Sequence, residues 1–176
     1  MNINDTIKKA EKDYGLDSGA YFKVKEGSNK IRVLTEALPY QSYYKGNKTF
    51  KFVGWICDYV DGKVKLYFFP KTVYEAIGSL QVTEDYAFED MPMPYDVSIN
   101  AKNAGTKEVE YQVMPARSNT PVDQEILTQL AGKKTIEEVI AQLKENDSKN
   151  GNTAPEPQHQ PVQSVQDEPD FSQIPF

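Results

Sequence analysis

The sequence predicts a mainly β fold, in which a five-stranded barrel carries one internal helix and is followed by C-terminal helices and a disordered acidic tail. Three observations predict it. Short segments between residues 20 and 117 alternate apolar and polar side chains, as half-buried strands do. Apolar residues recur at helical spacing within 72–81 and again within 118–146. Residues 147–176 are rich in Asn, Gln, Pro, Ser and acids, and such a chain buries too little apolar surface to become ordered.

Residues 1–19 precede the first strand and carry the pattern of a short helix. Ile7, Ala10 and Tyr14 fall on one face of such a helix. A frayed leader is an equally good interpretation, because Gly15 ends the pattern at once.

Three strands are expected before the internal helix. In chain order, the segments are a strand at 21–35 with a turn or bulge at 26–29, a Tyr-rich loop at 38–48, a strand at 49–59 and a strand at 63–70. Asp61 and Gly62 give a strong hairpin signal between the last two strands.

The internal helix is expected at 72–81, where Val73 and Ile77 align. An acidic loop at 84–94 and two strands, at 95–102 and 107–116, follow it. Three strands, a helix and two further strands is the order of the OB-fold, a five-stranded and partly open barrel. A different small barrel or an α+β sheet is the alternative.

Two helices are expected after the barrel, and the second begins with a capping box at Thr135 and Glu138. Its apolar stripe predicts that the pair packs on the barrel. A dimerisation helix is the alternative, which leaves a homo-oligomer open. The chain therefore divides into a leader (1–19), an OB-fold domain (20–117), a helical extension (118–146) and an acidic tail (147–176).

The charge is unevenly distributed along the chain. The net charge of the whole chain is −6, but residues 21–71 carry nine Lys and one Arg against four acids, which gives +6. Residues 146–176 carry one Lys against five acids, which gives −4. The basic window also holds 12 of the 20 aromatic residues. A basic, aromatic body in an acidic protein indicates a polyanionic partner.

Composition argues against an enzyme, a membrane protein and a secreted protein. The chain has no apolar run long enough to cross a membrane and no signal peptide, and its single cysteine, Cys57, cannot form an internal disulfide. We therefore expect a cytoplasmic protein. The only histidine, His159, lies in the tail, and no phosphate-binding Gly-rich loop is present. We expect no catalytic residue, metal or cofactor, and a metal-dependent nuclease is the enzyme alternative.

The outward faces of the first three strands form the candidate interface for single-stranded DNA. On the second strand we assign Lys51, Trp55 and Tyr59 outward, because the other face is almost wholly apolar. Asp58 would then point inward unless a bulge near Gly54 breaks the register. The candidate residues are Lys23, Lys25, Arg32, Tyr43, Tyr44, Lys51, Trp55, Tyr59, Lys63, Lys65 and Tyr67.

Lysines beside aromatic rings suit a single strand, because phosphates need cations and unpaired bases need flat apolar surfaces. Stacking contributes about 1–3 kcal/mol per base and does not depend on sequence. Each ring taken alone is more typical of a barrel core than of a binding surface, so the combination with positive charge carries the prediction. Nothing in such a surface reads the 2′-hydroxyl, so single-stranded RNA remains an alternative.

The tail ends in Ile174, Pro175 and Phe176 after an acidic run. Such an end is either a random exposed terminus or a peptide that docks into an apolar pocket with a basic rim on another protein.

The sequence DFSQIPF at residues 170–176 resembles the C-terminal tip of bacterial single-stranded DNA-binding proteins, which end in an acidic run followed by Ile-Pro-Phe. The body resembles phage single-stranded DNA-binding proteins in GSNKIRVL (27–34), in YVDGKVKLYFF (59–69) and in YDVSINAKNAGTKEVEYQVMP (95–115).

The resemblance implies an OB-fold that coats and protects single-stranded DNA during replication, recombination and repair, in the host cytoplasm if a phage encodes it. It also implies that Asp170, Ile174, Pro175 and Phe176 recruit replication or recombination proteins. Ser172 and Gln173 depart from the family, which has acids there, and this weakens the expected contact with a basic rim. An adaptor whose barrel is only a scaffold for the tail is the remaining alternative.

Overall fold

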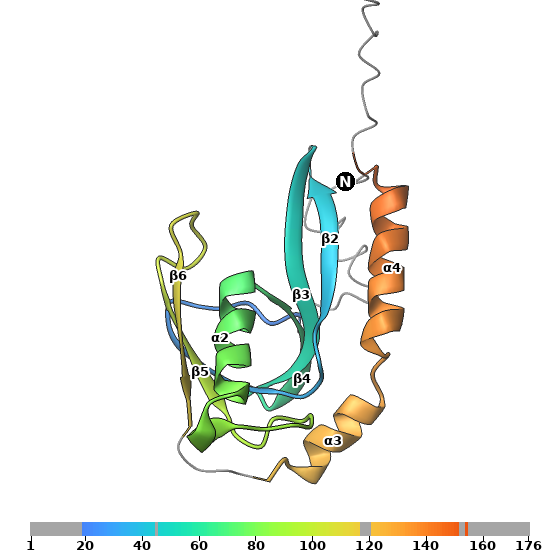
Figure 1. Cartoon of the computed structure of the whole chain (residues 1–176). Coiled ribbons are helices and arrows are strands. Elements are labelled where there is room, and N and C mark those ends of the chain that lie inside the picture. Colours follow the sequence, from blue (N-terminus) through green and yellow to red (C-terminus); the bar gives the residue numbers. More distant parts are fainter. Residues whose placement is uncertain (1–18, 45, 117–120, 152–153, 155–176) are drawn as a thin grey trace, which may run out of the picture.

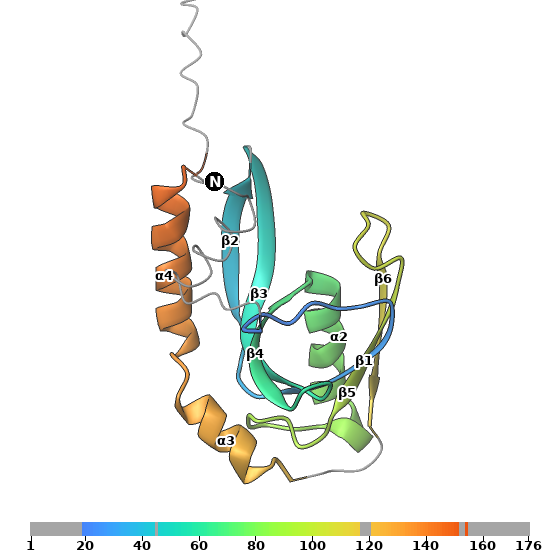
Figure 2. The same ribbon diagram turned by 180° about the vertical axis from the view of Figure 1, so that it is seen from behind.

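The computed structural model describes residues 19–44, 46–116, 121–151 and 154. The fold is mainly β, with one open antiparallel sheet of six strands and three α-helices in these residues (Figures 1 and 2). In chain order, the elements are β1 (Gly27–Val33), β2 (Leu38–Tyr44), β3 (Asn47–Asp58), β4 (Lys63–Phe69), α2 (Lys71–Gln81), the short 3-10 helix η1 (Glu84–Tyr86), β5 (Val97–Lys102), β6 (Glu110–Pro115), α3 (Gln124–Ala131) and α4 (Ile136–Lys149).

Strand β3 is the centre of the sheet. Its first half pairs with β2, and its second half pairs with β4 on one edge and with β1 on the other. Strands β1 and β2 therefore follow each other along one edge of β3, and the chain bends between them at residues 34–37. Gly54 lies opposite this bend, where an added Cβ would lie 3.1 Å from Cβ of Ala37 and 3.3 Å from the ring of Phe69. The missing side chain at Gly54 is what allows the bend to pack against the sheet.

The first two strands differ from the sequence-based prediction. Residues 21–25 are not a strand, and their backbone pairs with the sheet through one isolated parallel bridge between Tyr21 and Leu66. Their alternation arises because Phe22 and Val24 point into the core while the residues between them do not. The Tyr-rich segment expected as a loop is instead β2, which forms a hairpin with β3.

The predicted five-stranded barrel is wrong, because the described strands form an open sheet of six. The path β4-β3-β1-β5-β6 does not close, since β4 and β6 do not pair. The outer edge of β4 is already covered: Leu66 accepts a hydrogen bond from Phe22 N at 2.9 Å and donates one to Ala20 O at 2.8 Å. Val64 N donates to Gln129 Oε1 at 3.0 Å. These contacts occupy the backbone groups that β6 would need.

The two faces of the sheet each carry an apolar core. The inner face, named here for the side that α2 covers, buries Val73 and Ile77 of α2 against β1, β3 and β5. The outer face buries Ile136 and Ile140 of α4 against β2, β3 and β4. The predicted internal helix is confirmed as α2, and the predicted packing of the C-terminal helices on the sheet is confirmed for α3 and α4.

Helix α4 begins at the predicted capping box. Thr135 Oγ1 accepts from Glu138 N at 3.3 Å, and Glu138 Oε2 accepts from Thr135 N at 2.9 Å. The helix continues to Lys149, beyond the expected end at residue 146. Near its end, Asp147 accepts a hydrogen bond from the Tyr40 hydroxyl, which ties α4 to β2.

The predicted leader helix and most of the predicted tail lie outside the described residues. Among the helices of the described residues, none is both long and apolar enough to cross a membrane.

We expect Gly54→Val to lower the free energy of unfolding by about 1–3 kcal/mol, because the added carbons overpack the bend at Ala37. The matched control is Gly78→Ala in α2, where an added Cβ meets nothing within 4 Å. That change should stabilise the protein by about 0.5–1 kcal/mol. Urea unfolding measures both, and a neutral Gly54→Val would contradict the role given to Gly54.

Candidate nucleic-acid interface

The structure divides the predicted interface between the two faces of the sheet. Pairing of β3 with β4 runs without a bulge through Gly54, so the suggested break in register is absent. In this register Trp55 lies beside Leu66, and Tyr67 lies beside Gly54. Trp55 therefore belongs to the outer face and Tyr67 to the inner face, and the prediction that they share one face is wrong.

Trp55 is buried rather than exposed. The α3–α4 connection covers it, and its Nε1 donates to Lys134 O at 2.9 Å. Only 8 % of the residue is exposed. Lys133 Nζ lies 5.6 Å from the centre of the ring. Trp55 does lie on the face predicted for it, together with Lys51. That face is not exposed at Trp55, because α3 and α4 cover it.

Tyr67 lies in the inner core, with only 3 % exposure. Its ring packs edge-on against Phe22 at 4.9 Å between centroids. Burial raises the pKa of the Tyr67 hydroxyl. Its predicted place on an exposed stacking surface is therefore wrong, because the inner face of β4 is core.

Arg32 is also buried, and the structure corrects its predicted exposure. Its Nε donates to Asp96 Oδ1 at 2.6 Å, and the Tyr59 hydroxyl donates to the same oxygen at 2.5 Å. Lys30 Nζ lies 3.5 Å from Asp96 Oδ2. Burial alone would raise the pKa of Asp96, but these hydrogen bonds and charges outweigh it and lower that pKa. Arg32 thus stabilises β1 against β5 within the fold.

Lys65 forms a second ion-pair cluster at the β3–β4 turn. Its Nζ lies 2.7 Å from a carboxylate oxygen of Asp58 and 2.7 Å from one of Asp61. Burial would lower the pKa of Lys65, but the two carboxylates outweigh it and raise that pKa. Asp58, whose inward position conflicted with the predicted parity, is thereby neutralised by Lys65.

The other predicted residues are more accessible. Lys23, Lys25, Tyr59 and Lys63 are exposed, and Tyr43 and Lys51 are half-buried. The side chain of Tyr44 and the four tail residues Asp170, Ile174, Pro175 and Phe176 lie outside the described part of the chain.

The β2–β3 hairpin presents a surface that the sequence analysis missed, formed by Tyr43, Lys48, Phe50 and Phe52 and called the hairpin surface below. These residues share one face, because Tyr43 pairs directly with Lys48, which has the parity of Phe50 and Phe52. Phe50 is 41 % exposed, whereas Phe52 is half-buried.

The rings of the hairpin surface continue an aromatic row that begins on α2. Tyr74 stacks on Phe52 with centroids 4.5 Å apart and planes at 28°, and Phe52 meets Phe50 edge-on at 5.2 Å. The row is half-buried at Tyr74 and Phe52 and exposed at Phe50. Sequence parity assigned this face to the core because it is apolar. The signal against that assignment was its position near the hairpin turn at Gly46, beyond the reach of α2.

The hairpin surface also carries the positive charge of Lys48. Residues 38–57 contain no acidic residue, and Lys51 of this segment has the opposite parity, so it lies on the outer face. In Figures 1 and 2 the β2–β3 hairpin and the β5–β6 hairpin project in the same direction, on either side of α2. Both strands β3 and β6 contact α2. The exposed end of the aromatic row therefore lies on one of these two projecting hairpins, β2–β3.

Comparison with protein-family models, with curated proteins and with solved structures found no match. The described residues hold no group of three or more His, Cys, Asp or Glu side chains placed to bind a metal ion.

The Arg32–Asp96 pair should make stability depend on acidic pH. Because the pKa of Asp96 is lowered in the folded state, its contribution is complete above the ordinary carboxyl value of 3.8 and is lost as the pH falls through the lowered pKa. We expect the free energy of unfolding to fall less steeply from about pH 5 to about pH 3 in Asp96→Asn than in the unchanged protein.

Urea unfolding at a series of pH values measures this slope. Asp85→Asn, which removes an exposed carboxylate, is the matched control and should keep the slope of the unchanged protein. Equal slopes in the unchanged protein and Asp96→Asn would contradict the assignment.

Proposed function

We propose that the protein binds single-stranded DNA without sequence preference, through the hairpin surface, and coats and protects it. The observation that carries the proposal is Phe50, a ring that is 41 % exposed at the end of an aromatic row and stands beside Lys48. Phe52 contacts this ring edge-on, and the exposed part of the ring is accessible to a ligand. Stacking on an unpaired base would cover it, and Lys48 would meet the adjacent phosphate.

A duplex fits this surface less well than a single strand. Base faces are available for stacking only where bases are unpaired, and a double helix presents base edges and phosphates instead. Lys48 is exposed on the same surface, so it adds salt-dependent attraction for either form. The aromatic ring is the part of the surface that prefers single strands.

The order of the strands supports the proposal. The path β4-β3-β1-β5-β6, with α2 between β4 and β5, has the strand order of an OB-fold whose barrel is left open. In this correspondence the β2–β3 hairpin extends the connection between the first and second barrel strands, and residues 103–109 join the last two. OB-folds bind oligonucleotides with these two connections.

The tail completes the proposal. Asp170, Ile174, Pro175 and Phe176 would dock on replication or recombination proteins, which would be brought to DNA that the body coats. The motif DFSQIPF supports this role through its resemblance to a docking tip. Such a protein would act in the cytoplasm, where its DNA partner lies.

Replacing Phe50 with Ala should weaken binding to fluorescent oligo-dT by about 1–3 kcal/mol, because one stacking surface is lost. Fluorescence anisotropy with single-stranded and duplex probes measures it. Met114→Ala is the matched control: Met114 is similarly exposed, at 46 %, but lies on β6 with the parity of the outer face.

Two results would overturn the proposal at different levels. Unchanged affinity in Phe50→Ala would remove the hairpin surface as the site. Equal affinity of the unchanged protein for single and double strands would remove the function itself.

Replacing Lys48 with Ala should reduce the salt dependence of binding, because the variant makes one phosphate contact fewer and its binding therefore releases fewer counterions. The slope of log K against log salt should become shallower by about 0.7, the value for one contact to a single strand. Lys144→Ala, which removes an exposed lysine of α4, should leave the slope unchanged. A salt titration of oligo-dT binding provides the measurement, and equal slopes for Lys48→Ala and the unchanged protein would exclude a phosphate contact at Lys48.

A further inference from the structure

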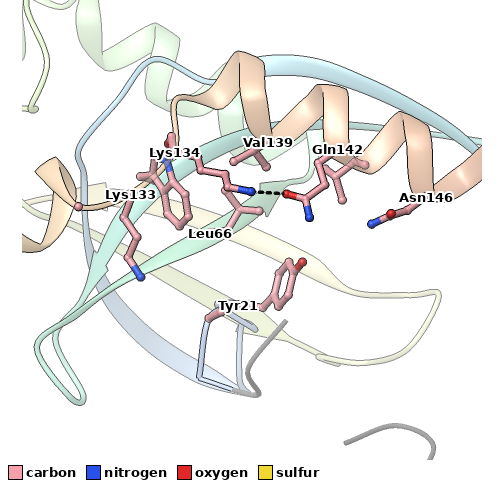
Figure 3. A pocket seen from close by; sticks show the side chains of 11 residues that line it. Tyr21, Leu66, Lys133, Lys134, Val139, Gln142 and Asn146 are labelled. Carbon is pink, nitrogen blue, oxygen red and sulfur yellow. Dashed lines mark hydrogen bonds between the residues drawn. The ribbon is translucent and has the colours of Figure 1, made fainter. Parts of the chain in front are cut away.

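A cavity of about 250 Å³ lies on the outer face of the sheet, between the sheet and α4. Its boundaries are the segment at Ala20 and Tyr21, strands β3 and β4, the α3–α4 connection and one side of α4 (Figure 3). The hairpin surface belongs to the inner face, so the cavity is a separate feature. It is smaller than the roughly 300–1,000 Å³ of sites for drug-sized ligands, and it therefore suits one planar group with a short extension.

The walls of the cavity are apolar and aromatic. Trp55, Leu66, Val139 and Leu143 line it from the sheet and from α4. Tyr21 lies across the open space from the α4 side chains in Figure 3. The ring of Tyr21 stacks on Phe68, with centroids 5.7 Å apart and planes at 24°, so it is held in place as a flat wall.

The polar groups of the cavity are cationic or neutral. Lys133, Lys134, Gln142 and Asn146 line it, and none of the described residues that line it is acidic. Lys134 Nζ donates to Gln142 Oε1 at 2.9 Å, and the carboxamides of Gln142 and Asn146 face the open space (Figure 3). An amide both donates and accepts hydrogen bonds, so it can pair with the edge of any nucleobase.

We propose that this cavity binds a single nucleotide. The base lies between Tyr21 and the apolar wall, its edge meets the carboxamides of Gln142 and Asn146, and its phosphate meets Lys133 and Lys134. The side chain of a docked apolar peptide would satisfy the walls but would offer no hydrogen bond to the amide nitrogen of Gln142 or to the carboxamide of Asn146, whereas the edge of a base offers both donors and acceptors. The inference deepens the proposed function and rests on it, because it adds a second contact point for the same class of ligand.

The natural chain contains its own probe for this cavity. Trp55 lines the cavity and is the only tryptophan among the 176 residues. Its fluorescence therefore reports on the cavity, whereas anisotropy of a labelled strand reports on all bound DNA. We expect thymidine monophosphate to quench Trp55 fluorescence in a saturable way in the full-length protein.

Filling the cavity should abolish this response. Leu143→Phe places a ring in the space and should weaken nucleotide binding at least tenfold. The matched control, Ala141→Phe, adds the same ring at an exposed position of α4 and should bind as the unchanged protein does. If Leu143→Phe does not fold, Lys133→Ala provides the test: it should weaken binding of thymidine monophosphate several-fold and leave binding of thymidine unchanged.

Free nucleotide and strand are distinguished by a parallel titration with oligo-dT in the Phe50→Ala background. Quenching by thymidine monophosphate supports a site for free and strand-borne nucleotides, and quenching by oligo-dT alone assigns the cavity to a nucleotide of a strand. Absence of saturable quenching by both ligands overturns the inference, as does quenching that the folded cavity variants retain.

The two proposals fail in different ways. Strong oligo-dT anisotropy without Trp55 quenching removes the cavity and leaves the hairpin surface. Trp55 quenching by the mononucleotide without any preference for single strands supports the cavity and removes the proposed coating function.

Discussion

The structure depends on β3 being buried on both of its faces over its second half. Val53, Trp55 and Cys57 pack under α3 and α4, while Phe52 and Ile56 pack toward α2. A strand with two covered faces needs partners on both edges as well, and β1, β2 and β4 supply them. The positions of all three described α-helices follow from this strand, because each covers one of its faces or those of its neighbours.

Closure of the barrel competes with the packing of the chain ends. Residues 20–22 and Gln129 of α3 satisfy backbone groups at the outer edge of β4. These contacts cover the edge of β4 and so protect it from pairing with another strand. The opening between β4 and β6 is spanned by α2, which contacts β6 and β3. Opening of the sheet and attachment of the C-terminal helices are therefore parts of one arrangement.

Charged residues in the body divide into structural and accessible groups. Arg32 and Lys65 are held by Asp96 and by Asp58 with Asp61, and these ion pairs join neighbouring strands. Such buried pairs add little net free energy of folding, because the cost of desolvating the charges offsets most of their attraction. The accessible lysines of the described residues include Lys48 on the hairpin surface, Lys133 and Lys134 at the cavity, and Lys23, Lys25 and Lys63 elsewhere. A basic sequence window thus overstates the charge that a ligand meets.

Most strands and helices of the described residues follow from the sequence, because alternation, helical spacing and the Thr135 capping box are local signals. The exceptions are residues 21–25, which form no strand, and β2, which was expected as a loop. The concentration of rings and lysines that motivates a nucleic-acid partner is likewise visible in the sequence. Which rings are accessible depends on tertiary packing. Parity tells that Trp55 and Phe50 point to opposite sides, but a side becomes solvent or core only when distant helices cover it. Helix α4 covers Trp55, whereas α2 does not extend far enough along β3 to cover Phe50. The sequence of β3 alone contains no signal for either arrangement.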